Sequence, residues 1–169
     1  MKILTLLRHA NASQAAGDQS DRERPLSPGG VASCEALASF LADAPVGADL
    51  VLCSTAVRAQ QTFARLGRGF AVGRVEHADD LYLASDDTLL ERLWAIEPEI
   101  DRVLVVAHNP GIQILTTRLA RSGDEHALQR AARGFPAAGL AELHFEVADW
   151  SAVRDGAGAL VRFVTPDSL

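Results

Sequence analysis

The chain contains 169 residues, of which 48% are hydrophobic and 22% are charged. This balance is typical of folded globular proteins and excludes an intrinsically disordered chain, and the length favours one domain spanning residues 1–169. The formal net charge of −6 argues against a nucleic-acid-binding protein, which normally presents a basic face. An anionic ligand would therefore have to bind to a few local arginines.

The apolar segments of the chain are too short for a membrane anchor. Arg8 and His9 interrupt the first apolar run, which therefore lacks the core of a signal peptide, and later runs fall far short of the roughly 20 residues that a span needs. Cys34 and Cys53 have no CxxC motif or neighbouring histidine, so we expect buried free thiols. We expect a cytoplasmic protein without membrane contacts.

The first predicted elements are a strand, a polar loop and a helix. The run KILTLL at 2–7 has the continuous apolar character of a strand buried on both faces of a parallel sheet. Polar residues occupy 10–25, and a loop of this length in a compact domain is often functional. The helix predicted at 28–43 has Ser27 placed as its N-cap and Pro28 at its first position.

Two further buried strands are predicted at 49–53 (DLVLC) and 102–107 (RVLVVA). Between them, helical spacing of apolar residues predicts a helix at 55–66. A second helix, at 86–97, has Ser85 placed as its N-cap and several leucines on one face.

The last third of the chain is predicted to contain a helix at 111–121 and alternating strands at 139–147 and 159–164. The β-α-β-α order implies an α/β protein, a three-layer α/β/α sandwich with a mainly parallel central sheet. Ligands of such sheets bind at the carboxyl ends of the strands.

Polar side chains follow three of the predicted strands at that edge. Arg8 and His9 follow the first strand, Arg58 the second, and His108 the third. The planar guanidinium of arginine matches phosphate oxygens, and the N-termini of the following helices add backbone N–H donors. Each histidine alone would be read as a structural residue, but the convergence of all four predicts a phosphate site.

A histidine in such a site has two chemical roles. A neutral imidazole can attack phosphorus and form a phosphoenzyme, or it can donate a hydrogen bond to the transferring oxygens. Adjacent arginines disfavour protonation and would keep a nucleophilic histidine neutral near pH 7. The pairing of arginine with histidine therefore has a chemical reason.

Four stretches, in this order, resemble the histidine phosphatase superfamily with its phosphoglycerate mutase-like fold: LLRHANAS, RPLSPGG, CSTAVRAQQT and VVAHNPGI. More narrowly, they are similar to the SixA-type phosphohistidine phosphatases. The resemblance implies that His9 is the phosphorylated nucleophile, that Arg8 and Arg58 bind the phosphoryl group and that His108 lines the pocket. It also implies a role for Arg24, which would reach either the phosphate or the rim of the pocket.

The acid that protonates the leaving group is harder to place. Relatives use a carboxylate, and the candidates here are Asp79 and Asp80 in EHADDLYLAS. Neighbouring residues of an extended segment point to opposite sides, so at most one faces the pocket, and Asp80 aligns better with the family's acidic residue. A solvated loop aspartate, or a turn residue that precedes a helix, is the alternative reading. The motif also departs from the commoner Arg-His-Gly, because residue 10 is alanine.

A weak or absent acid favours phosphohistidine as the substrate, because imidazole leaves readily from its labile P–N bond. The expected protein is therefore a phosphatase without metal or cofactor that acts on a phosphohistidine-containing protein, such as a phosphotransfer domain. A small phosphoester remains an alternative substrate. A mutase would need substrate-gripping insertions, for which 169 residues leave little room.

Other classes of protein fit the sequence less well. Cys53 and Arg58 are separated by four residues, whereas cysteine phosphatases use C-x5-R. The sequence has no H-x-D, D-x-D or H-x-x-H pattern for a metal-dependent phosphatase. A regulatory module that binds phosphate or phosphohistidine without turnover would keep the same residues, and labelling of His9 would distinguish it.

Overall fold

The computed structural model describes residues 1–67 and 70–169 and contains a seven-stranded sheet with the order β3-β2-β4-β1-β6-β7-β5. The strands are β1 (Lys2–Arg8), β2 (Val46–Ser54), β3 (Phe70–Ala78), β4 (Arg102–Ala107), β5 (Ala120–Gly123), β6 (Leu140–Phe145) and β7 (Gly158–Val164). Only β6 runs antiparallel to its two neighbours, while the other described pairs are parallel. The prediction of an α/β protein with a mainly parallel sheet is confirmed.

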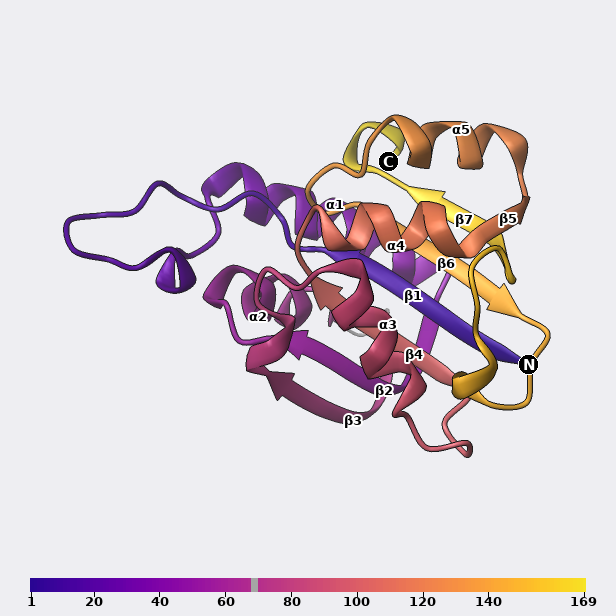
Figure 1. Ribbon diagram of the computed structural model, residues 1–169. Helices are drawn as coiled ribbons and strands as arrows, with labels where there is room; N and C mark the ends of the chain where they lie inside the picture. The colour runs from indigo at the N-terminus through magenta and orange to yellow at the C-terminus, as the bar shows by residue number, and fades with distance from the viewer. Residues whose placement is uncertain (68–69) are drawn as a thin grey trace.

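Helices cover both faces of this sheet (Figure 1). They are α1 (Pro28–Asp43), α2 (Val57–Ala64), α3 (Asp86–Trp94), α4 (Gly111–Leu119) and α5 (Glu125–Arg133). The buried apolar side chains of α3, α4 and α5 belong to one core cluster, and Leu37 and Leu41 of α1 pack with Ala59 of α2 in a second cluster. The protein is thus the expected three-layer sandwich.

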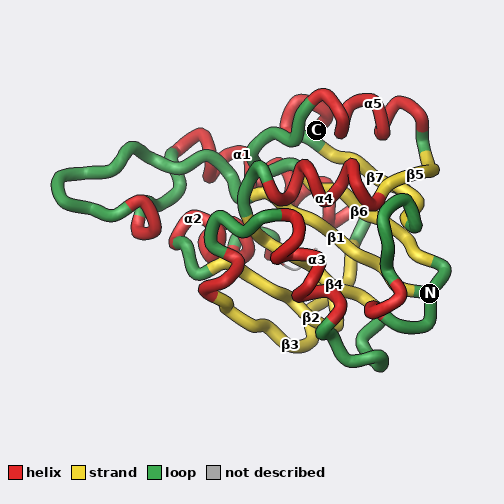
Figure 2. The backbone as a smooth tube through the Cα atoms, in the orientation of Figure 1, coloured by secondary structure: helices red, strands yellow, loops and turns green. Residues whose placement is uncertain are grey.

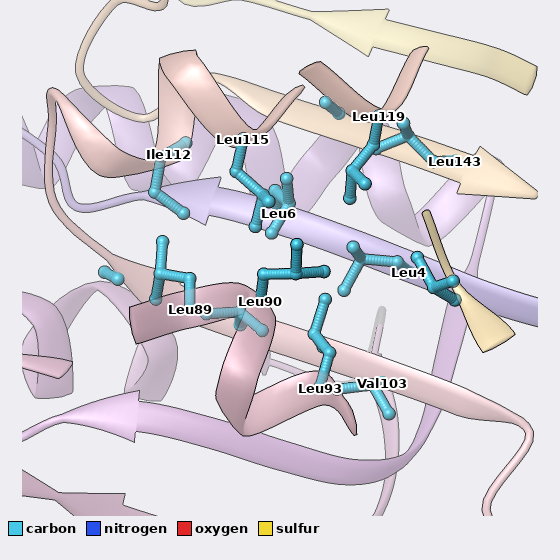
Figure 3. Close-up of a cluster of buried hydrophobic side chains, with 14 of the residues drawn as sticks. Leu4, Leu6, Leu89, Leu90, Leu93, Val103, Ile112, Leu115, Leu119 and Leu143 are labelled. Carbon is cyan, nitrogen blue, oxygen red and sulfur yellow. The ribbon is translucent and has the colours of Figure 1, made fainter. Parts of the chain in front are cut away.

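The two clusters follow from the alternation of side chains along the strands. Leu4 and Leu6 of β1 belong to the first cluster and Leu7 to the second, because successive side chains point to opposite faces. Figure 3 shows Leu6 close to Leu90 of α3 and Leu115 of α4. Each buried leucine contributes about 1.5–3 kcal/mol relative to exposure, and these contacts fix the sheet that carries the site.

Helix α1 begins as its sequence predicts. Pro28 is its first residue, and the Ser27 Oγ accepts the Gly30 N–H at 3.1 Å. Gly30 lies against the backbone of Asn11, where a Cβ atom would collide with the Asn11 carbonyl oxygen. The start of α1 therefore packs closely on the chain just after β1, which carries part of the site.

Some elements differ from those expected. Strand β3 was not predicted, because charged residues interrupt its apolar pattern, and the predominantly polar α5 was missed for the same reason. The helix predicted at 111–121 ends at Leu119, and its last residues begin the short edge strand β5. The strands at 2–7 and 102–107 and the helix at 28–43 agree closely with their predictions.

Within the ranges that the structure describes, no helix is long and apolar enough to cross a membrane. Cys34 and Cys53 are both buried and free, as expected. Residues 10–25 form a loop that projects from the carboxyl ends of the strands, with a single short 3₁₀ turn at Asp21–Glu23 (Figure 2).

Candidate active site

Strand ends bring the predicted histidines and arginines to one edge of the sheet. Arg8 at the end of β1 is in register with Ala107 at the end of β4, so His9 and His108 follow at the same level. The His9 N–H donates to the Ala107 carbonyl at 3.1 Å and extends this alignment. Arg58 lies in the first turn of α2, which begins shortly after β2 ends.

The side chain of Arg58 lies between the two imidazoles. Its Nε–H donates to His9 Nε2 at 3.3 Å, and its Nη2 lies 3.5 Å from His108 Nδ1. The ring centroids of the two histidines are 4.9 Å apart. Arg58 is 4% exposed and His108 is 1% exposed. The structure therefore gathers a buried cation and two imidazoles at the strand ends.

His9 presents an unprotonated ring nitrogen to Arg58. Its Nδ1 lies 2.7 Å from the carbonyl oxygen of Ala10, and a carbonyl only accepts, so Nδ1 carries the hydrogen. The Nε2 atom then holds the lone pair, which accepts the Arg58 Nε–H. Ala10 itself is fully buried, and its N–H donates to Thr62 Oγ1 of α2 at 3.0 Å. The carbonyl that orients His9 is thus held in place by the core.

His108 is oriented by the end of β2. Its Nε2 lies 2.8 Å from Ser54 Oγ. Because the guanidinium of Arg58 can only donate, Nδ1 is the acceptor of that long contact, and Nε2–H donates to Ser54. Both histidines are therefore held as neutral imidazoles in defined tautomers.

Burial is the main reason that the two histidines remain neutral. It lowers the pKa of His9 to about 4, aided by the charges of Arg58 and Arg8 and opposed by the Ala10 carbonyl. Burial likewise lowers the pKa of His108 to about 3, with His9 and Arg58 as further causes. The sequence predicts neutral histidines from the adjacent arginines, whereas desolvation is the larger effect.

Arg8 is held by the loop between α5 and β6. Its Nη1 donates to the Phe135 carbonyl at 2.7 Å, and Nδ2 of Asn109 donates to the same oxygen at 3.0 Å. Nε of Arg8 and Oδ1 of Asn109 are buried without a hydrogen-bond partner among the described residues. Unpaired buried polar atoms of this kind are costly, and a ligand group or water beside them would supply the missing hydrogen bonds.

Asp21 is a member of the site that the sequence did not reveal. Its carbonyl oxygen accepts Arg58 Nη1 at 2.6 Å, and its Oδ2 accepts both Arg58 Nη2 at 2.9 Å and the Tyr82 hydroxyl at 2.6 Å. The hydrogen bonds from Tyr82, Arg24 and Arg58 lower the pKa of the Asp21 carboxyl group well below its usual range. The only signal in the sequence was the length of the polar loop, which names no residue.

Arg24 contacts the site through Asp21. Its Nη1 donates to Asp21 Oδ1 at 2.7 Å, and its Nε donates to the carbonyl of Ser13 at 2.8 Å. No hydrogen bond or ion pair of the described residues joins Arg24 to His9 or Arg58. The structure therefore places Arg24 at the rim, bracing the loop that carries Asp21.

The two aspartates considered as acids point in different directions. They lie in a 3₁₀ turn (Asp79–Leu81) and not in the extended segment that was assumed. Oδ2 of Asp80 lies 3.4 Å from Nε of Arg92 in α3. Oδ1 of Asp79 instead accepts the Thr55 hydroxyl at 2.7 Å, next to the end of β2, and also pairs with Arg22. Thus Asp79 approaches the loop that leads to Arg58, whereas Asp80 contacts α3.

The other chemistries considered have little support in the site. Cys53 is fully buried, and burial raises the pKa of its thiol to about 12, which disfavours the thiolate that a cysteine phosphatase needs. Among residues 1–67 and 70–169, no group of three or more histidine, cysteine, aspartate or glutamate side chains is placed to hold a metal ion.

Residues 4–82 match the histidine phosphatase superfamily (branch 1). An uncharacterized protein of Mycobacterium tuberculosis (strain ATCC 25618 / H37Rv) is 34% identical over 162 residues, which cover 95% of this chain and 99% of that protein. The structure called "Putative Phosphohistidine Phosphatase SixA" from Nakamurella multipartitia is 30% identical, with a TM-score of 0.83 over 98% of this chain and 96% of that one. The similarly named structure from Agrobacterium tumefaciens is 32% identical, with a TM-score of 0.78 over 98% and 99% of the two chains.

Proposed function

The chain belongs to the histidine phosphatase superfamily, and on this premise we propose that it is a protein phosphohistidine phosphatase that works through phosphorylated His9. The family and the SixA-like neighbours support a phosphatase. The phosphohistidine substrate and the roles of the individual residues are our proposal. They rest on the arrangement of the strand ends and on the chemistry of the leaving group.

The observation that carries the proposal is the tautomer of His9. Because Nδ1–H donates to the Ala10 carbonyl, the lone pair of Nε2 faces Arg58, beside the ring of His108. A neutral nucleophile at the meeting point of oriented donors is what attack on a phosphoryl group requires. A histidine with only a structural role would not require Arg58 and a second imidazole beside it.

The reaction then has two steps. Nε2 of His9 attacks the phosphorus of the substrate phosphohistidine, the P–N bond to the substrate breaks, and the substrate imidazole leaves and takes up a proton from water. Water next attacks the phosphorus of phospho-His9, the new P–N bond breaks, and inorganic phosphate leaves neutral His9. Arg58 and Arg8 would hold the phosphoryl oxygens in both steps, with the Arg58 Nε–H donor moving from His9 to an oxygen, and His108 would line the pocket beside them.

The surroundings of the two aspartates favour a phosphoramidate over a phosphoester. An alkoxide leaving group needs a proton from an acid, whereas imidazole needs little assistance. Asp80 is paired with Arg92, and Asp79 already accepts bonds from Thr55 and Arg22, which also lower its pKa and make it a poor acid. Asp80 nevertheless remains our first candidate for a proton donor if a phosphoester is turned over.

The test compares three substrates: a chemically phosphorylated histidine protein, a phosphoserine peptide and a sugar phosphate. We expect fast hydrolysis of the first alone, insensitivity to EDTA, and acid-labile ³²P on wild-type protein after rapid quench. His9→Ala should show neither label nor turnover, while the exposed control His126→Ala should behave as wild type. Turnover by His9→Ala, or a protein that binds phosphate and never becomes labelled, would overturn the proposal.

A further inference from the structure

A basic cavity lies directly beside the candidate phosphate site. Its volume is about 530 Å³, and its walls come from α4, α5, the loop after α5 and the C-terminal segment. Arg8 and Asn109, the residues next to His9 and His108 in the chain, form one end of it. Arg130 and Arg133 of α5 line it as well. Arg8 thus belongs to both the phosphate site and this cavity.

The cavity concentrates positive charge in an otherwise acidic protein. Three arginines line it against one carboxylate, that of Asp167, while the whole chain carries a formal charge of −6. Arg8, Arg130 and Arg133 form no ion pair with any residue in the described ranges, and unlike the other described arginines without an ion pair they line one cavity together. The local charge is therefore left for an outside anion.

The cavity wall also holds the guanidinium group of Arg130 in place. Nη2 of Arg130 donates to the Phe163 carbonyl at 2.6 Å, and its guanidinium carbon lies 5.5 Å from the centre of the Phe163 ring. Arg133 is exposed, three residues further on at the end of α5, so both side chains lie on neighbouring positions of one helix face. The dipole of α5 favours arginines at its C-terminal end but does not explain why both line one cavity.

The end of the cavity nearest the phosphate site is polar and incompletely paired. Nε of Arg8 and Oδ1 of Asn109 are buried and lack partners among the described residues. The rest of the lining mixes these charges with apolar groups, namely Phe135, Pro136 and Phe163. A second phosphate would use only the charges, whereas a peptide segment with acidic and apolar side chains would use the whole lining.

We infer that this cavity docks acidic side chains of the protein that carries the phosphohistidine. The inference rests on the proposed function, because the docked segment would flank the histidine whose phosphoryl group enters the site beside Arg8. Glutamate or aspartate side chains would pair with Arg133 and Arg130, and neighbouring apolar atoms would lie on Phe135 and Phe163. The cavity would thereby select among phosphohistidine proteins by the charge near their phosphorylated residue.

The test uses two synthetic phosphohistidine peptides that differ only in flanking glutamates or glutamines. For wild-type protein we expect a KM about 3- to 10-fold lower for the glutamate peptide at low salt, a preference that shrinks at high salt. Arg133→Glu should abolish or invert this ratio. The matched control is Arg121→Glu, an exposed arginine that follows the far end of α4, and it should keep the ratio.

A direct binding experiment separates failure of the inference from failure of the proposed function. The unphosphorylated glutamate peptide should bind to wild-type protein and lose affinity in Arg133→Glu, whether or not any peptide is hydrolysed. Equal KM values for both peptides, with no binding of the unphosphorylated one, would overturn the docking site and leave the phosphatase intact. Binding without any hydrolysis of phosphohistidine would overturn the proposed function alone.

Discussion

The candidate site has a half built on the sheet and a half built on loops, and the two differ in burial. Arg58 and His108, which follow strands β2 and β4, are almost fully buried. Asp21 and Arg24, from the loop after β1, have side chains that are 45% and 26% exposed. Buried charges and hydrogen bonds are strong and costly to disturb, whereas exposed ion pairs contribute little. The chemistry should therefore depend on the sheet-borne half, with the loop adjusting it.

Within the half of the site built on the sheet, removal of the nucleophile should cause the largest loss of activity. We expect His9→Ala to abolish turnover and labelling, because no other described side chain places a neutral imidazole nitrogen at the same point. Single-turnover assays with phosphohistidine protein measure this directly. His9→Ala should remain folded by circular dichroism, because His9 lies outside the hydrophobic clusters. Residual phosphoenzyme in this variant would place the nucleophile elsewhere.

Replacement of Arg58 should cause the second-largest loss of activity. Arg58→Ala removes the cation that contacts both imidazoles, and we expect kcat/KM to fall by about 10²-fold or more, as for the loss of one transition-state donor. Arg58→Lys should recover only part of the activity, because an ammonium cannot reproduce the guanidinium contacts with Asp21. If Arg58→Ala kept near-wild-type rates, the sheet-borne half would not be the chemical one.

The buried His108 and the half-buried His9 should make the protein less stable in mild acid. The unfolded imidazoles have a pKa near 6.5, while burial lowers the pKa of His9 to about 4 and of His108 to about 3. Between those values the unfolded state binds more protons, so the stability present above pH 6.5 is lost as pH falls toward 4. Urea titrations at pH 7.5, 6 and 5 should show this loss.

A matched pair of variants checks the cause of that loss. We expect the loss to be up to roughly 1 kcal/mol per pH unit for each histidine, and His108→Asn should reduce the slope. The exposed control His126→Asn should leave it as in wild type. An unchanged slope in His108→Asn would mean that other groups dominate the acid sensitivity.

The loop-borne half should respond more weakly. Asp21→Asn keeps the shape but removes the charge that pairs with Arg58, and we expect kcat to fall by roughly 5- to 20-fold with little change in KM. Asp21→Glu should restore part of kcat, which a merely structural role would not predict. Asp18→Asn, an exposed residue of the same loop, is the control. A larger loss than for Arg58→Ala would reverse the ranking of the two halves.

The same division between the two halves separates the residues that could be predicted from the sequence from those that could not. Continuous apolar runs predict buried strands, and the residues that follow parallel strands lie at one edge of the sheet. The convergence of His9, Arg58 and His108 could therefore be predicted. Asp21 could not, because its place depends on how a 16-residue polar loop folds back, and no periodicity encodes that. The prediction of an extended segment around Asp79 and Asp80 was wrong for a related reason, since the structure has a 3₁₀ turn there.

Arg24 gives the smallest and most specific test of the comparison. Because its guanidinium contacts Asp21 and neither His9 nor Arg58, its effect should pass entirely through Asp21. We expect Arg24→Ala to lower kcat about 2- to 4-fold, as for a partly exposed pair, and to have almost no further effect in the Asp21→Asn background. Additive losses in the double variant would mean that Arg24 reaches the phosphoryl group itself, which would make the loop a direct part of the phosphate site.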